Sequence, residues 1–131
     1  MENFNINNEH NGNIKISDEV VATIASVATK EVSGIAGLNL SFTDEIVSKF
    51  GKKNAPKSIK ITQNNENITI DISVVVNYGV RIPDVSWEVQ ENVKKSVELM
   101  SGLNVDKVNV IVAGVSFELD KENTDNNQTE Q

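Results

Sequence analysis

The stretch VVVNYGVRIPDVSWEVQENVKKSVELMSGLNVDKVNVIVAGVSF, residues 74–117, decides the fold of this chain. It contains the end of a strand, a helix that begins at a proline, and a second strand, with almost no loop between them. A strand, a helix and a returning strand predict a right-handed crossover with two parallel neighbouring strands. This stretch therefore predicts architecture well and chemistry hardly at all.

The helix in this stretch has one apolar face. Pro83 and Asp84 are suited to its first turn, and Ser101 with Gly102 should end it. Apolar residues recur along it within about 120° of a helical wheel. The residues of this stripe are Val85, Val89, Val93, Val97 and Met100. We expect the stripe to pack on the core.

The strand before this helix has one buried face. Ile68, Ile70, Ile72, Val74, Val76 and Tyr78 keep a period of two. Ile59 and Ile61 show the same alternation, and the asparagine-rich turn at residues 64–67 joins the two segments into a hairpin. Polar residues such as Thr69 and Asp71 fill the alternate positions. The sheet should therefore carry helices on one side and face water or a partner on the other.

An earlier helix is expected to begin after Ser17, a favourable N-cap, and to end at Gly34. Its apolar residues recur in steps of four. The expected core face consists of Val20, Ile24, Ala28 and Val32, with Val21 and Ala25 beside them. Small residues in this helix allow close packing on a sheet or another helix.

These elements predict one small α+β domain over residues 14–119. It has a mixed sheet of about three strands with helices on one face, in the order strand, strand, helix, strand, preceded by a helix. Residues 1–13 and 120–131 are strongly polar and cannot bury enough apolar surface to offset the entropy of ordering. We therefore expect a disordered leader and a disordered acidic tail.

Composition limits the compartment. The chain has 131 residues and no cysteine, so it forms neither a disulfide framework nor a thiolate metal site. No apolar run near the start suggests a cleaved signal peptide, and none approaches the roughly twenty residues that cross a bilayer. We expect a cytoplasmic protein without direct membrane insertion. The formal charge is −7, and the two polar ends carry five of these charges, so the folded part is nearly neutral.

The sequence offers little for catalysis. His10 is the only histidine, and it lies in the asparagine-rich leader, where nothing rigid holds it against a nucleophile or metal. The glycine turns at residues 34–37 and 51–54 lack the second half of a phosphate-binding loop. We therefore predict no catalytic, cofactor-binding or metal-binding residues, and no small-molecule substrate or DNA partner.

Trp87 is the most interesting single residue. A step of 100° per residue places it about 160° from Val89, on the polar side of its helix. An isolated tryptophan on a polar face suggests an anchor for a partner, because tryptophan is enriched at interface hot spots. The alternative is that Trp87 folds over the helix start and packs on Tyr78 or a terminal segment.

Two charged features mark the domain. Lys52, Lys53 and Lys57 form a basic edge, and Glu88, Glu91 and Glu98 give an acidic helix. These opposite charges predict head-to-tail contacts between copies that need not close into a ring. The alternative is that the lysines protect an edge strand and that the glutamates belong to a solvated face with nearby lysines.

Several motifs together resemble one known family. They are EVSGIAGL at residues 31–38, YGVRIP at 78–83, VQENVKK at 89–95, SGLNV at 101–105 and VNV at 108–110. In this order they resemble the alkaline shock protein family of mainly Gram-positive bacteria, over about residues 13–117. The resemblance implies a non-enzymatic cytoplasmic protein of cell-envelope homeostasis and stress, prone to self-assembly and, in some members, held at the membrane by a small membrane-anchored partner.

Two functions follow as hypotheses. The first is an interaction or scaffold protein that forms homo-oligomers and is recruited to the inner face of the cell membrane by its partner. The alternative is RNA binding, because the layout resembles KH-type domains and GKKN at residues 51–54 lies between a short helix and a strand. This turn lacks the second glycine with which a GXXG loop approaches phosphates.

Overall fold

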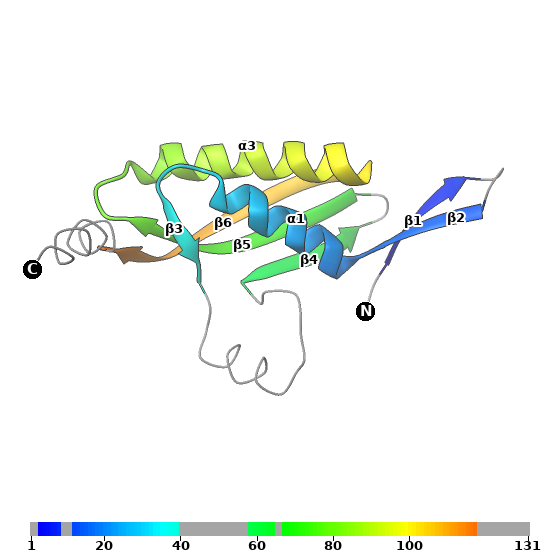
Figure 1. The fold of residues 1–131 in the computed structure, drawn as a ribbon, viewed down its shortest axis with the longest axis horizontal. Helices are drawn as coiled ribbons and strands as arrows, with labels where there is room; N and C mark the ends of the chain where they lie inside the picture. The colour runs from blue at the N-terminus through cyan, green and yellow to red at the C-terminus, as the bar shows by residue number, and fades with distance from the viewer. Residues whose placement is uncertain (1–2, 9–11, 40–57, 65–66, 118–131) are drawn as a thin grey trace, which may run out of the picture.

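The computed structural model describes residues 3–8, 12–39, 58–64 and 67–117 (Figure 1). The elements in chain order are β1 (Asn3–Asn8), β2 (Gly12–Ser17), α1 (Asp18–Lys30), β3 (Ile35–Leu38), β4 (Ile59–Asn64), β5 (Asn67–Asn77), α3 (Ile82–Ser101) and β6 (Asn104–Ser116). Both helices cover the same face of the main sheet (Figure 1). The predicted small α+β domain with helices on one face is confirmed.

Strand β5 is the centre of the main sheet. Strand β6 runs parallel to it over the whole length of β5, as the crossover predicted. On the other side, β4 pairs antiparallel with residues 67–72 of β5 and β3 with residues 74–76. Strands β3 and β4 therefore lie end to end, and the four-stranded sheet is only three strands wide. Their ends meet at Ser73, which accepts a hydrogen bond from Asn39 N–H and donates one to the carbonyl of Ser58.

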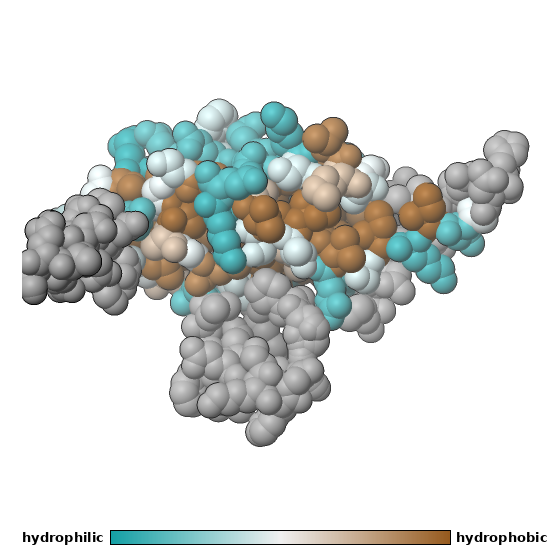
Figure 2. All heavy atoms as spheres, in the orientation of Figure 1, coloured by the Kyte–Doolittle hydropathy of each residue, from teal (hydrophilic) through white to brown (hydrophobic). Residues whose placement is uncertain are grey.

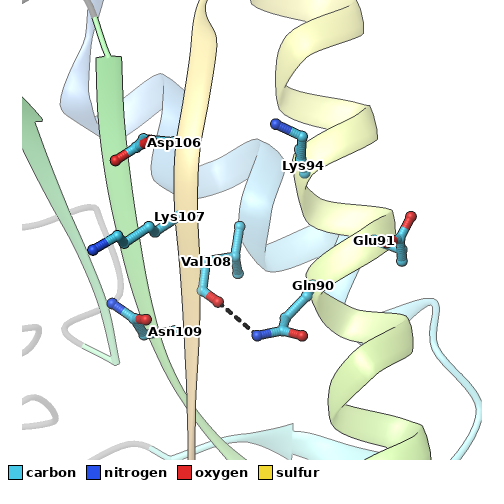
Figure 3. Close-up of a pocket in the computed structure, with 7 residues that line it drawn as sticks. All are labelled: Gln90, Glu91, Lys94, Asp106, Lys107, Val108 and Asn109. Carbon is cyan, nitrogen blue, oxygen red and sulfur yellow. Dashed lines mark hydrogen bonds between the residues drawn. The ribbon is translucent and has the colours of Figure 1, made fainter.

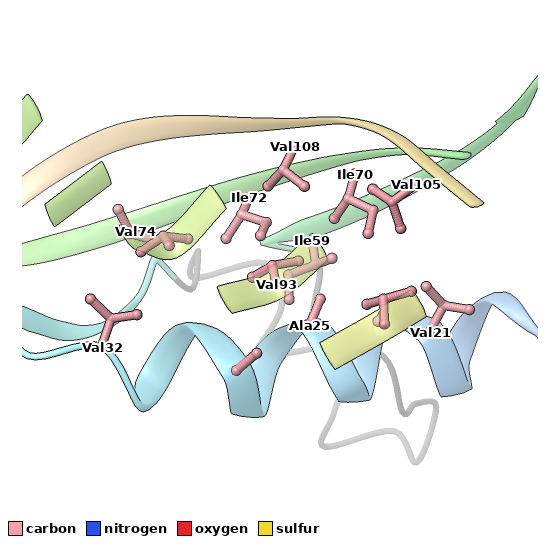
Figure 4. Close-up of a cluster of buried hydrophobic side chains, with 14 of the residues drawn as sticks. Val21, Ala25, Val32, Ile59, Ile70, Ile72, Val74, Val93, Val105 and Val108 are labelled. Atoms are coloured by element: carbon pink, nitrogen blue, oxygen red, sulfur yellow. The ribbon is translucent and has the colours of Figure 1, made fainter. Parts of the chain in front are cut away.

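The core lies between the sheet and the two helices (Figure 4). The alternate residues of β5 from Ile68 to Val76 that face the helices are almost completely buried, whereas the residues between them are half-buried. The predicted one-sided burial is therefore confirmed. Helix α3 contributes Val85, Val89, Val93 and Val97 to this core. Burial of each such side chain contributes about 1.5–3 kcal/mol, so these residues hold the two layers together.

Helix α3 begins one residue before Pro83 and ends at Ser101, where Gly102 takes the left-handed conformation. The predicted bounds are thus confirmed, but Met100 is exposed and does not belong to the core stripe. The buried face continues from Val97 in a step of four residues to Ser101, whose hydroxyl donates to the Val97 carbonyl. A step of three to Met100 turns the side chain away from the sheet.

Helix α1 begins as predicted, since the N–H of Val20 donates to the Ser17 hydroxyl at 3.3 Å. Its predicted core face was partly wrong: Val20 is 48% exposed, whereas Val21 is fully buried. The buried residues are Val21, Ala22, Ala25, Ser26, Ala28 and Thr29. A repeat of four advances about 40° per step on an α-helix, so a stripe written in fours drifts off the core face.

The end of α1 also differs from the prediction. The helix stops at Lys30, four residues before Gly34, and a turn leads into β3. Gly34 has a φ of +102°, and a Cβ atom built on it lies only 2.9 Å from Val85 Cγ2. This glycine therefore permits both the turn and the close approach of α3.

Residues 3–8 and 12–17, which overlap the leader that we predicted to be disordered over residues 1–13, are strands in the structure. Strands β1 and β2 pair antiparallel over six positions and form a hairpin that extends from the domain (Figure 1). Phe4 stands opposite Ile16 and Ile6 opposite Ile14 in the register. The prediction weighed the asparagine content and overlooked this apolar alternation. The predicted acidic tail at residues 120–131 lies outside the described residues.

Apolar side chains also reach the surface. Figure 2 shows brown atoms over α1 and at one end of α3. The exposed large apolar residues there are Val20 and Val27 of α1 and Leu99 and Met100 of α3. Among the helices that the structure describes, none has a run long and apolar enough to cross a bilayer.

Candidate partner-binding surface

In the part of the chain that the structure describes, a shallow hollow lies beside α3 on the α1 side and another on the β6 side. The hollow on the α1 side, which we call the Trp87 hollow, has a volume of roughly 520 Å³. It is lined by Glu31, Val32, Ser33, Trp87, Glu88, Glu91, Asn92 and Lys95. Residues from α3 thus meet residues from the turn that follows α1.

The exposed position that the helical wheel predicted for Trp87 is confirmed, because this side chain is 60% exposed. Tyr78, the alternative packing partner, instead stacks on Phe117, with ring centroids 4.9 Å apart. The indole forms one side of the Trp87 hollow. It offers a large apolar surface beside charged groups, an arrangement typical of interface anchors.

A hydrogen-bonded clamp joins two lining residues of the Trp87 hollow. The side-chain amide of Asn92 donates to the carbonyl oxygen of Ala28 at 2.8 Å and to the Glu31 carboxylate at 3.1 Å. This clamp joins the end of α1 to the middle of α3 and orients Glu31 toward the hollow. Sequence reasoning missed Glu31 and Asn92 as site residues, because residues 61 positions apart meet only in the folded chain.

The charge of the Trp87 hollow is predominantly negative. Its lining includes the carboxylates of Glu31, Glu88 and Glu91 and a single ammonium group, that of Lys95. An aromatic face that shares a hollow with carboxylates attracts cations through the ring quadrupole and through ordinary charge attraction. The hollow is therefore suited to a lysine or arginine side chain of a partner.

The second hollow, of roughly 290 Å³, lies between α3 and β6 (Figure 3). Its lining residues are Gln90, Glu91, Lys94, Asp106, Lys107, Val108 and Asn109. Figure 3 shows Gln90 and Lys94 directed toward β6 and Glu91 directed away from it. Gln90 donates to the carbonyl of Val108 at 3.0 Å, so part of this lining serves the fold.

Glu98 links α3 to the start of β6. Its carboxylate accepts hydrogen bonds from Val105 N–H at 2.9 Å and from Lys94 Nζ at 3.2 Å, and Lys94 also donates to the Val105 carbonyl. The pKa of Glu98 lies below its ordinary value, chiefly because of the Val105 hydrogen bond; partial burial opposes this, and the Lys94 charge lowers the pKa further. Glu98 therefore has partners within the domain, whereas Glu88 and Glu91 of the predicted acidic helix form no hydrogen bond or ion pair with the residues that the structure describes.

The structure brings together only part of the predicted site. Trp87, Glu88 and Glu91 share the Trp87 hollow, and Glu98 lies outside its lining. The basic edge of Lys52, Lys53 and Lys57 lies outside the described residues. Within the described part of the chain, no three histidine, cysteine, aspartate or glutamate side chains gather closely enough to hold a metal ion.

The fold defines a small α+β domain in which a mixed sheet carries an exposed, charged helical layer. The model of the alkaline shock protein 23 family, described as having a cell envelope-related function, matches residues 6–117. The chain belongs to this family, and the resemblance of its motifs is confirmed.

Relatives with similar sequences support this assignment. The protein YqhY of Bacillus subtilis is 37% identical over 109 residues, which cover 83% of this chain and 81% of YqhY. YloU of the same organism is 37% identical over 106 residues, covering 79% of this chain and 88% of YloU. A stress response regulator gls24 homolog of Streptococcus pyogenes is 24% identical over 115 residues, covering 84% of this chain and 64% of that protein.

Among solved structures, a variant of MamM CTD is 15% identical, with a TM-score of 0.47 over 75% of this chain and 99% of that chain. This likeness is too weak to bear on function.

Proposed function

We propose that this protein is a non-enzymatic scaffold of the bacterial cell-envelope stress response. It associates with other copies of itself, and it docks a membrane-anchored partner through the Trp87 hollow. The observation that carries the proposal is the placement of one exposed tryptophan among three carboxylates on the outer side of the helical layer. The family description and the stress-regulator relative agree with a role at the cell envelope.

The chemistry of the Trp87 hollow indicates the kind of partner. Segments of membrane proteins next to the bilayer on the cytoplasmic side are rich in lysine and arginine. Such a cation can lie on the face of Trp87 while Glu88 and Glu91 neutralise its charge. Docking of this kind holds the protein at the inner face of the membrane without inserting any part of it.

The same geometry argues for binding rather than catalysis. The polar side chains on the β6 side of α3 form hydrogen bonds with the backbone of β6. They are Gln90, Lys94 and Glu98. A general base must instead reach the proton of a bound substrate with a suitable pKa. The groups left to face solvent around Trp87 offer charge complementarity.

The test in cells is crosslinking and capture of the full chain, with and without nuclease. The wild-type protein should retain a membrane protein after nuclease treatment, and Trp87→Ala should lose it. Leu99→Ala is the matched control, because Leu99 is 79% exposed on the same helix but lies outside the hollow. Recovery of RNA alone, abolished by nuclease, overturns the proposal in favour of the KH-like alternative.

The test in vitro uses the intrinsic fluorescence of Trp87, the only tryptophan in the chain. A peptide of alternating lysine and leucine residues should shift its emission, and rising salt should weaken the response because charge attraction is screened. Combined Glu88→Lys and Glu91→Lys substitutions should weaken binding at least about tenfold, since like charges across an interface repel. Asp84→Lys is the control, because Asp84 is exposed on α3 but does not line the hollow.

A further inference from the structure

The β1–β2 hairpin has no third strand within the described part of the chain. Its two strands pair with each other, β2 contacts α1, and Ile16 near the end of β2 packs against the hydrophobic core. Ile14 of β2 is half-exposed, opposite Ile6 in the register. An isolated two-stranded hairpin is only marginally stable in water, and a third strand makes such a unit stable. The hairpin is therefore suited to donate an edge to another sheet.

Strand β6 is the edge of the main sheet, and α3 covers the first half of it. Three side chains spaced four residues apart along α3 bond the outward backbone groups of β6. The Glu98 carboxylate accepts a hydrogen bond from Val105 N–H, and Lys94 donates one to the Val105 carbonyl. Gln90 donates a hydrogen bond to the Val108 carbonyl. Strand addition at residues 105–108 is blocked, because these backbone groups already have partners.

Residues 110–115 of β6 have no such cover among the described residues. Backbone groups alternate in direction along a strand, so Val110 and Val112 present theirs outward like Val108. One further step of four residues from Gln90 toward the start of α3 leads to Ser86. Its side chain is much shorter than that of Gln90 or Lys94. The open edge, which we define as residues 110–115, follows directly after the covered one.

Exposed apolar side chains surround the open edge. Ile111, Val115 and Phe117 of the β6 segment are each about half-exposed or more, and Tyr78 stacks on Phe117. A free strand edge with exposed apolar side chains is a template for pairing with another chain. Burial of these side chains by an added strand would favour association.

The hairpin and the open edge lie at opposite ends of the domain (Figure 1). A hairpin in this position is directed away from the open edge of its own chain, and the six residues of β1 match the length of residues 110–115. We propose that the β1–β2 hairpin of one copy adds to the open edge of β6 of the next copy. This inference rests on the self-association in the proposed function and assigns its two surfaces.

Such a contact joins two different surfaces, so it repeats and produces open head-to-tail chains rather than a closed dimer. All copies carry the same net negative charge of −7, so salt should strengthen the assembly by screening their repulsion. Docking at the Trp87 hollow has the opposite salt dependence. The two interactions are therefore distinguishable in one titration.

The experiment measures the mass of the full chain by sedimentation over a range of concentrations. The wild type should exceed the mass of one chain, 14.3 kDa, by severalfold at high concentration. Ile14→Lys disrupts the hairpin that is added, and Val115→Lys disrupts the open edge that receives it. Each variant should therefore stay at the mass of one chain. Val20→Lys is the control, because Val20 has the same 48% exposure as Val115 and lies on α1; it should assemble like the wild type.

Mixing the two variants tests the direction of the contact. Ile14→Lys keeps an intact open edge, and Val115→Lys keeps an intact hairpin. An equal mixture of the two should therefore stop at twice the mass of one chain. If Ile14→Lys assembles normally and only Val115→Lys fails, β6 pairs with β6 and the inference is overturned. A wild type that stays at the mass of one chain also overturns it.

Folding and partner binding are checked in the same samples. Circular dichroism and denaturant unfolding should show that both variants keep the folded state. Both should also keep the fluorescence response of Trp87 to the lysine-leucine peptide. A wild-type protein without that response contradicts the docking proposal alone. A mixture of the two variants that does not stop at twice the mass of one chain contradicts the hairpin contact alone.

Discussion

Asn92 of α3 donates a hydrogen bond from its side-chain amide to the carbonyl oxygen of Ala28 in the last turn of α1, 2.8 Å away. The Ala28 carbonyl lies near the end of α1, where carbonyl groups lack partners within the helix. The same amide reaches Glu31. Asn92 therefore couples the lining of the Trp87 hollow to the packing of the two helices.

Asn92→Ala should lower the free energy of unfolding by about 1–2 kcal/mol, because a partly buried carbonyl loses its donor. Asn92→Asp should cost more, since a carboxylate repels both the carbonyl and Glu31. Urea unfolding measures both. Asn109→Ala is the control: it removes a bond to Asp71 between exposed side chains and should cost less than about 0.5 kcal/mol. Equal losses at the two positions would contradict this assignment.

Gly34→Ala should destabilise the protein for two separable reasons, a positive φ and a close contact with Val85. Gly79→Ala isolates the first, because Gly79 has a φ of +100° and open space for a Cβ. We expect about 1 kcal/mol for Gly79→Ala and clearly more for Gly34→Ala. Gly37→Ala, with neither constraint, should be nearly neutral. Adding Val85→Ala to Gly34→Ala should recover only the part of the lost stability that comes from the close contact with Val85. A double-mutant cycle measures this part.

Glu98 should make stability depend on pH. Its pKa is lower in the folded state than in the unfolded state, chiefly through the Val105 N–H. Its contribution is therefore fully present above the unfolded pKa and is lost as the pH falls through the folded pKa. Unfolding curves from neutral pH to acid should show a steeper loss for the wild type than for Glu98→Gln. Parallel pH profiles would mean that this carboxylate does not contribute.

Val21→Ala and Val20→Ala test the corrected core face of α1. Val21 is fully buried and Val20 is 48% exposed, so the first substitution should cost roughly 1–3 kcal/mol. The second should be neutral or stabilising by a few tenths of a kcal/mol, because alanine favours helices more than valine does. Thermal and urea unfolding compare the two variants directly. A larger loss for Val20→Ala would restore the face that the sequence predicted.

Long periodic elements were the most predictable part of the fold. The alternation along β5 and the valines of α3 extend over many residues, and the short crossover leaves one simple arrangement, a parallel β5–β6 pair. Helix α1 was less predictable, because Val20 and Val21 are both apolar and only tertiary packing decides which one is buried. The β1–β2 hairpin was missed because its few apolar positions are separated by asparagines, which disfavour strands.

The candidate site was predictable only where one helix determines it. A helical wheel suffices to place Trp87, Glu88 and Glu91 on the polar side of α3. It does not show that Glu31 reaches Asn92 from another element, nor that Glu98 bonds the backbone of Val105. These contacts depend on the spacing of the layers, which no local pattern encodes.

The meeting of two strand ends at Ser73 has a consequence for how β3 and β4 are held in the sheet. The segment that leaves the sheet at Asn39 returns at Ser58, and both ends bond the backbone of the same residue. Strand β5 therefore holds the ends of β3 and β4 in place through its own backbone at Ser73. The position of these two ends is thus a property of the sheet, set by the central strand on which both pair.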